Sequence, residues 1–109
     1  MVGISFAKEI FYTARQFDAE EARTMGLVNR VVKAAELEAY VKKYAETIGE
    51  NAPMTIATTK FTVGEVVKDE SKRDLAKCAA MVKKCFESSD YTEGRRAFME
   101  KRKPAFTGT

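Results

Sequence analysis

The chain has 109 residues, of which 45% are hydrophobic and 32% are charged, and it carries a net charge of +3. These values fit one globular domain rather than a disordered segment. The sequence contains no histidine, which excludes histidine-based triads and removes the commonest metal ligand. The charge is too small to indicate nucleic-acid binding, and no apolar run reaches the roughly 18 residues needed to span a bilayer. We therefore expect a cytoplasmic protein without a metal, an intrinsic cofactor, a nucleic-acid partner or a membrane partner.

The N-terminal third of the chain predicts two helices and one extended segment. Residues 4–13 form a mostly apolar helical pattern, typical of a helix that lies between other elements. Residues 17–26 predict a short helix that Asp18 and Glu21 begin with a capping box and that Gly26 ends in a left-handed conformation. Residues 27–32 are β-branched and alternating, which makes them the only candidate strand. A single strand would have to pack on helices or pair outside this sequence.

The middle of the chain predicts three further helices. Residues 34–48 show the clearest helical periodicity, and residues 54–67 follow with Asn51 as the expected N-cap. Residues 69–74 are a charged run, expected to be a solvated turn or helix start before an amphipathic helix. With the helix at the C-terminal end, the predicted fold class is all-α, with about five to six helices and one short extended segment.

The last helix is the candidate functional element. Ser89 or Asp90 is expected to cap it, and Pro104 should end it by residue 103. Phe98 and Lys101 are three residues apart, so on a helix they would share a face. An aromatic ring beside an ammonium group suits an adenine ring and a phosphate, but it equally suits a packed helix with a solvated lysine.

Catalytic groups are not indicated elsewhere. The 16 acidic residues fall on expected helix starts or polar faces, so we predict no carboxylate in an apolar setting and no catalytic residue. Cys78 and Cys85 are two helical turns apart, too far for a disulfide within one helix, and are expected to be buried on one stripe.

Five stretches resemble, in order, the C-terminal part of the enoyl-CoA hydratase/isomerase (crotonase) family. One of them, Thr13–Arg15, has Ala14 where the family usually has glycine. The others are the residues 18–32 (the "AxEAxxxGLVxxVV" pattern), 36–37, 51–60 ("NAPxAxxxxK") and 89–106 ("SxDxxEGxxAFxEKRKPxF").

The resemblance implies that residues 1–109 are a C-terminal helical domain without the family's β-β-α spiral core. In the family that core supplies the backbone amides that hold the thioester oxygen and the carboxylates that move protons. We therefore expect the chain to be non-catalytic by itself and to belong to an enzyme that hydrates 2-enoyl-CoA or moves its double bond. The implied partners are the N-terminal domain, further subunits of a trimer-type homo-oligomer and a CoA thioester. The coenzyme A contacts implied are Phe98, for adenine, and Lys101, for a phosphate. The alternative is a helical self-association or docking module with no CoA-related activity.

Overall fold

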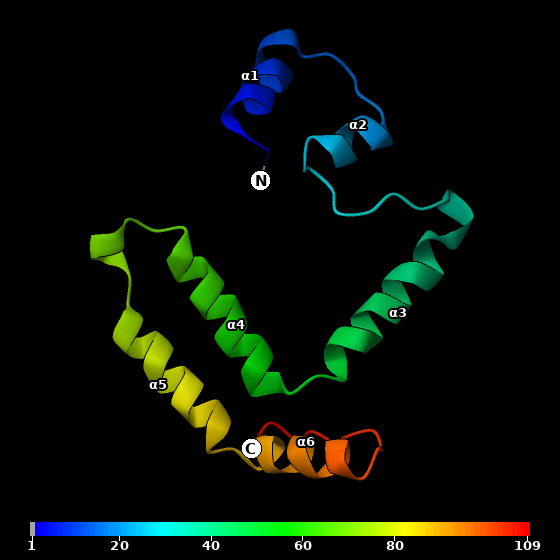
Figure 1. Ribbon diagram of the computed structural model, residues 1–109. Coiled ribbons are helices and arrows are strands. Elements are labelled where there is room, and N and C mark those ends of the chain that lie inside the picture. Colours follow the sequence, from blue (N-terminus) through cyan, green and yellow to red (C-terminus); the bar gives the residue numbers. More distant parts are fainter. Residues whose placement is uncertain (1) are drawn as a thin grey trace. The chain divides into compact units, whose positions relative to one another are not determined.

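The computed structural model describes residues 2–109, which are helical and contain no strand (Figure 1). The chain divides into two compact units, one ending at Val41 and the other spanning Lys42–Thr109. The elements are α1 (Ile4–Thr13), α2 (Ala19–Thr24), the 3-10 helix η1 (Ala34–Glu36), α3 (Leu37–Gly49), α4 (Pro53–Val66), the 3-10 helix η2 (Glu70–Lys72), α5 (Leu75–Phe86) and α6 (Ser89–Met99).

Helix α2 begins and ends as its sequence predicts. The Glu21 amide donates to Asp18 Oδ1 at 2.8 Å, and the Asp18 amide donates to Glu21 Oε2 at 3.1 Å, which completes the capping box. Gly26 has a φ of 76°. Its amide donates to the Arg23 carbonyl, and the next amide, of Leu27, donates to Ala22. This pair of bonds around a left-handed residue is the Schellman ending of a helix.

The predicted strand at residues 27–32 is not formed. Among the described residues there is no second strand to pair with it. The amides of Leu27 and Val28 instead donate to the carbonyl of Ala22, at 2.9 and 3.4 Å, and help to close α2. The β-branched composition therefore did not decide the structure, because an extended segment without a partner has no ladder to join.

Helix α1 also ends in a left-handed residue, but here that residue is an alanine. Ala14 has a φ of 47°, and its amide donates to the carbonyl of Ile10 at 3.1 Å. The next residue, Arg15, pairs with Glu9 at 2.8 Å and with Glu21 at 2.9 Å. A Cβ in this region of φ costs about 1–2 kcal/mol, which glycine avoids.

We expect Ala14→Gly to stabilise the chain by about 0.5–1 kcal/mol, since relief of this strain exceeds the flexibility that glycine adds to the unfolded chain. Urea unfolding followed by circular dichroism measures the change. The matched control is Ala7→Gly within α1, where glycine should lower stability by about 0.5–1 kcal/mol. A loss of stability in Ala14→Gly would contradict this account of the turn.

Helices α4 and α5 lie side by side as an antiparallel hairpin (Figure 1). Glu65, near the end of α4, is only 3% exposed. Its carboxylate accepts from Lys68 Nζ at 2.6 Å and from the Asp74 amide at 2.9 Å. Asp74 in turn caps α5 by accepting from the Lys77 amide at 2.8 Å. One buried carboxylate thus ties the end of α4 to the start of α5.

The N-cap predicted at Asn51 is wrong. Ala52 occupies the N-cap position of α4 and makes no side-chain capping bond, and Pro53 lies in the first turn, where its missing N–H is tolerated. Asn51 instead contacts the preceding helix, where its Nδ2 donates to the carbonyl of Thr47 at 2.7 Å. It therefore satisfies the end of α3 rather than the start of α4.

Few apolar side chains are buried in the part of the chain that the structure describes. The buried ones are all small or flexible, namely Ala22, Met25 and Ala97. In the second unit, large apolar side chains of α4, α5 and α6 remain exposed, namely Val63, Val66, Leu75, Phe86, Phe98 and Met99. These helices thus present apolar faces that their own unit does not cover. None of the described helices has the length and apolarity required to traverse a bilayer.

Candidate functional site

Helix α6 is capped by Ser88, not by Ser89 or Asp90 as predicted. Ser88 Oγ accepts from the Tyr91 amide at 3.1 Å and donates to the Cys85 carbonyl at 2.7 Å. A hydroxyl both donates and accepts, so one side chain serves the start of α6 and the end of α5. This leaves the carboxylate of Asp90 available for another contact.

Helix α6 ends at Met99, earlier than a shared helical face for Phe98 and Lys101 requires. The Lys101 amide donates to the Phe98 carbonyl at 3.3 Å, and the Arg102 amide donates to Ala97 at 3.0 Å. This is the Schellman ending already seen at Gly26. The prediction that Phe98 and Lys101 share a helical face is therefore wrong, because Lys101 lies in the closing turn and not in the helix.

Lys101 occupies the left-handed position of that turn, with a φ of 53°. Glycine takes the corresponding position at the end of α2, with a φ of 76°. A non-glycine residue here stores roughly 1–2 kcal/mol of strain, which is typical of positions where a side chain has a role besides folding. Lys101 is exposed, and the ring of Phe98 is 85% exposed. Both predicted site residues are therefore open to a ligand.

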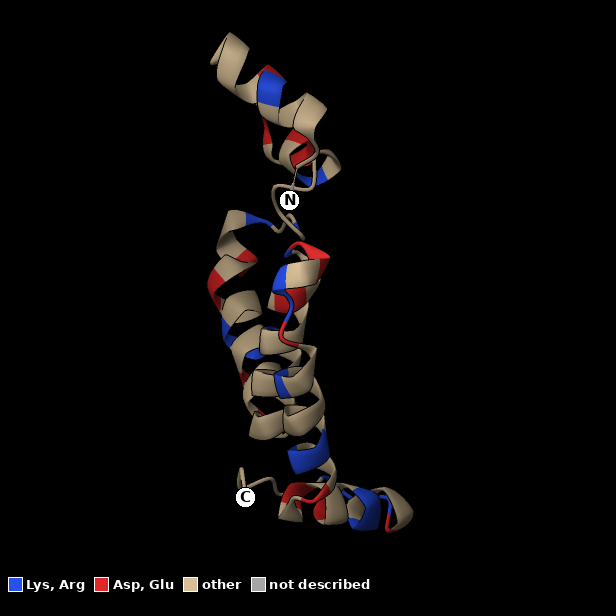
Figure 2. Ribbon diagram, turned by 90° about the vertical axis from the view of Figure 1, so that its left-hand side faces the viewer, with Lys and Arg blue, Asp and Glu red and all other residues tan. Residues whose placement is uncertain are grey.

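Glu93 organises the segment around this turn. Its carboxylate accepts from Arg96 at 2.6 Å, from Arg102 Nη1 and Nη2 at 2.6 and 3.0 Å, and from the Ala105 amide at 3.0 Å. The Arg102 guanidinium, followed by the Ala105 amide and Arg96, holds the pKa of Glu93 far below its usual range. Glu93 therefore keeps its charge at neutral and mildly acidic pH. Figure 2 shows the acidic and basic residues together on α6 and the segment after it.

Asp90 binds the C-terminal tail, defined here as residues 104–109. Its Oδ1 accepts from the Thr107 amide at 2.7 Å, and its Oδ2 accepts from the Gly108 amide at 2.9 Å. The Asp90 amide donates to the Thr109 carbonyl at 3.2 Å. The tail therefore runs back along α6 (Figure 1). Asp90 is 3% exposed, as is Glu65, so two carboxylates are shielded from solvent, each by hydrogen bonds to backbone amides or to a cation.

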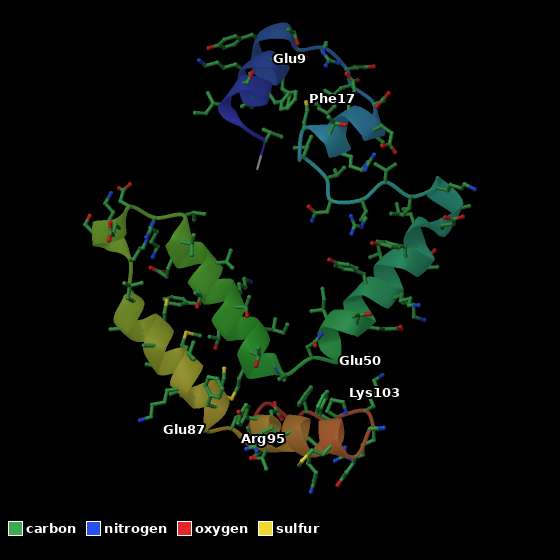
Figure 3. The ribbon with its side chains drawn as sticks, in the orientation of Figure 1. Glu9, Phe17, Glu50, Glu87, Arg95 and Lys103 are labelled. Carbon is green, nitrogen blue, oxygen red and sulfur yellow. The ribbon has the colours of Figure 1, made fainter. Side chains whose placement is uncertain are left out.

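The Phe106 ring lies against Gly94 of α6. A Cβ built on Gly94 would lie 3.5 Å from the Phe106 ring. The ring borders an open, mostly apolar groove of about 520 Å³ between α5, α6 and the start of α4. Phe98 and Arg95 lie on the rim of this groove, and Arg95 sits over the Tyr91 ring at 5.9 Å. In Figure 3, Arg95 marks α6, and Lys103 lies beyond the end of α6 beside Glu50, which it contacts.

The sequence did not indicate the groove or the two shielded carboxylates. Periodicity gave a usable signal for Glu65, which lies four residues after Phe61 on the inner face of α4. The two cysteines are free and half-buried, and Cys85 Sγ lies 3.2 Å from Thr58 Oγ1. Among residues 2–109, no group of three or more potential ligands is placed to hold a metal ion.

Comparison of the chain with known proteins identifies its family. The model of the family described as enoyl-CoA hydratase/isomerase matches residues 1–109. Over 97% of its length, the chain is 37% identical to a methylmalonyl-CoA decarboxylase of Escherichia coli (strain K12), of which it covers 41%. It is 36% identical, over 99% of its length, to a probable mitochondrial enoyl-CoA hydratase of Arabidopsis thaliana, of which it covers 36%.

Solved structures agree with these matches. The chain superimposes over 99% of its length on 43% of an enoyl-CoA hydratase of Mycobacterium marinum, with a TM-score of 0.85 and 30% identity. The fold and the motifs together define a helical part of a crotonase-type protein. The chain belongs to the enoyl-CoA hydratase/isomerase family, and it spans about two fifths of the length of the relatives that it matches.

Proposed function

We propose that this chain is the helical C-terminal region of a cytoplasmic enzyme that acts on acyl-CoA thioesters, by hydrating a 2-enoyl-CoA or moving its double bond. The match of the family over residues 1–109 carries the proposal. Within the region, Phe98 contacts the adenine of coenzyme A and Lys101 contacts a phosphate. The exposure of Phe98 and the left-handed backbone of Lys101 support these two roles.

In this proposal the region contributes binding and assembly, and another part of the enzyme contributes the chemistry. The exposed apolar faces of α4, α5 and α6 suit burial against a catalytic spiral domain or further subunits of a trimer-type homo-oligomer. No residue of the chain is assigned a catalytic role. We expect the purified chain to show no hydration of a 2-enoyl-CoA, and a rate that disappears on heat denaturation would contradict this division of roles.

Calorimetric titration of the chain with coenzyme A, and with coenzyme A that lacks its 3′-phosphate, tests the ligand contact. We expect weak binding of coenzyme A and weaker binding of the ligand without the phosphate, because Lys101 then loses its anionic partner. Equal binding of the two ligands would contradict the role of Lys101. The absence of binding at millimolar ligand would contradict both contacts.

A second candidate function is self-association or partner docking without any coenzyme A contact. The observation that favours it is the apolar surface at Val63, Leu75 and Phe86 of the second unit, which are 60%, 65% and 59% exposed. Burial of such side chains favours association by about 25 cal/mol per Å². Sedimentation over a wide concentration range tests this candidate, and a strictly monomeric chain would contradict it.

A further inference from the structure

Two features of the structure meet at the turn that carries Lys101. The first is strain, because a left-handed lysine is less stable than glycine in the same position. The second is that both sides of the turn are bonded to one side chain of α6. A turn that is unfavourable by itself keeps its shape only when the surrounding structure holds it.

Glu93 supplies that restraint from within the helix. Before the turn it accepts a hydrogen bond from Arg96, which is in α6. After the turn it accepts two hydrogen bonds from Arg102 and one from the backbone amide of Ala105. Bidentate guanidinium–carboxylate pairs fix direction as well as distance, and the Glu93 side chain is only 12% exposed. Arg102 and Ala105, which follow Lys101, therefore have little freedom to move.

The tail extends this restraint along α6. Asp90 binds the amides of Thr107 and Gly108, and the Phe106 ring lies against Gly94. Asp90, Glu93 and Gly94 lie within about one turn of helix, so one short surface holds the tail by its backbone and by one ring. Residues 100–109 thus form a closed loop that begins and ends on α6.

We propose that Glu93 is a positioning residue that holds Lys101 in its phosphate-binding orientation, with the tail as a strap that keeps the turn closed. The inference rests on the proposed function, since it concerns the orientation of the same lysine. It assigns a role to Glu93 and Arg102, neither of which is among the proposed ligand contacts. The negative charge of Glu93 is offset by Arg96 and Arg102, and this leaves the ammonium group of Lys101 to the phosphate.

The test compares wild type with Glu93→Gln and measures the affinity for coenzyme A and for coenzyme A that lacks its 3′-phosphate. We expect Glu93→Gln to weaken coenzyme A binding about fivefold and to leave the other ligand within about twofold, so that the preference for the phosphate is lost. Amide hydrogen exchange at Arg102 and Ala105 should become about tenfold faster, because their restraint is removed. A second variant, Arg102→Lys, keeps the charge but loses the bidentate pair and should give the same loss of preference.

The matched control is Glu87→Gln, which also removes one negative charge but pairs only with the exposed Lys83, at 3.6 Å. It should keep the preference for the phosphate. Equal weakening of both ligands in Glu93→Gln and Arg102→Lys would overturn the inference, because it would indicate general loss of structure. An unchanged preference in both variants would overturn the inference while the proposed function stands. A wild-type chain without any preference would overturn the proposed role of Lys101 and this inference together.

Discussion

Replacing Asp90 by alanine is expected to lower the free energy of unfolding by about 3 kcal/mol and to release the tail. The carboxylate of Asp90 accepts two backbone amides, from Thr107 and Gly108, in a position that is 3% exposed. Hydrogen bonds to a charged group contribute about 1.5–3 kcal/mol each, and the released amides recover part of this by bonding to water. Phe106 loses its support at the same time and should leave Gly94.

Urea unfolding of wild type and Asp90→Ala gives the change in stability, and amide exchange at Thr107 and Gly108 reports the release. The control is Asp69→Ala, since Asp69 is an exposed carboxylate whose pair with Lys72 is also exposed. Exposed ion pairs contribute at most about 1 kcal/mol, so Asp69→Ala should lower the free energy of unfolding by no more than that amount. A similar small effect in Asp90→Ala, with the two amides still protected, would show that the tail does not depend on Asp90.

The second large effect is expected for Lys101→Gly, which should change stability and ligand binding in opposite directions. Glycine relieves the left-handed strain at a φ of 53°, so the chain should gain about 0.5–1 kcal/mol of stability. The same change removes the ammonium group, and the affinity for coenzyme A should fall about tenfold, as one charge-assisted contact is lost. If Lys101 served only the fold, its replacement by glycine would not raise stability while lowering the affinity for coenzyme A.

Unfolding and titration of the same preparation measure both effects. The control is Lys103→Ala, which removes a neighbouring cation that pairs with Glu50 and does not have a left-handed backbone. It should leave stability almost unchanged and affect coenzyme A only through the net charge. If Lys101→Gly lowers stability, the account of the turn is wrong, and if it leaves the affinity unchanged, Lys101 does not bind a phosphate.

Local signals predicted the helices well, because their determinants lie within a few residues. Asp18, Glu21 and Gly26 are close in sequence, and together they begin and end α2 as expected. The helical periodicity of residues 34–48 reappears in α3, whose two ends differ from the prediction by three residues and by one, and the amphipathic helix expected after residues 69–74 appears as α5. In these segments, residues close in sequence determine the local structure.

Some of the contacts that the sequence analysis missed join residues that are distant in the chain. Asp90 was expected to cap α6, but amides 17 and 18 residues later in the chain take its carboxylate. The hydrogen bond that Glu65 accepts from the Asp74 amide also joins residues that are nine positions apart, at the end of α4 and at the N-cap of α5. Lys101 has a left-handed backbone because α6 ends just before it, and a lysine at this position does not predict that conformation. Contacts of this kind appear only once the helices have been placed.

The central claim, that this chain holds coenzyme A at the end of α6, is tested most directly by a residue-resolved amide NMR titration. The chain is titrated with coenzyme A and, in parallel, with coenzyme A that lacks its 3′-phosphate. We predict shifts confined to the amides around Phe98 and Lys101, with the shift at Lys101 weaker when the phosphate is absent. No shift at millimolar ligand, or shifts that avoid the turn after α6, would contradict the claim and favour an assembly or docking role for the chain.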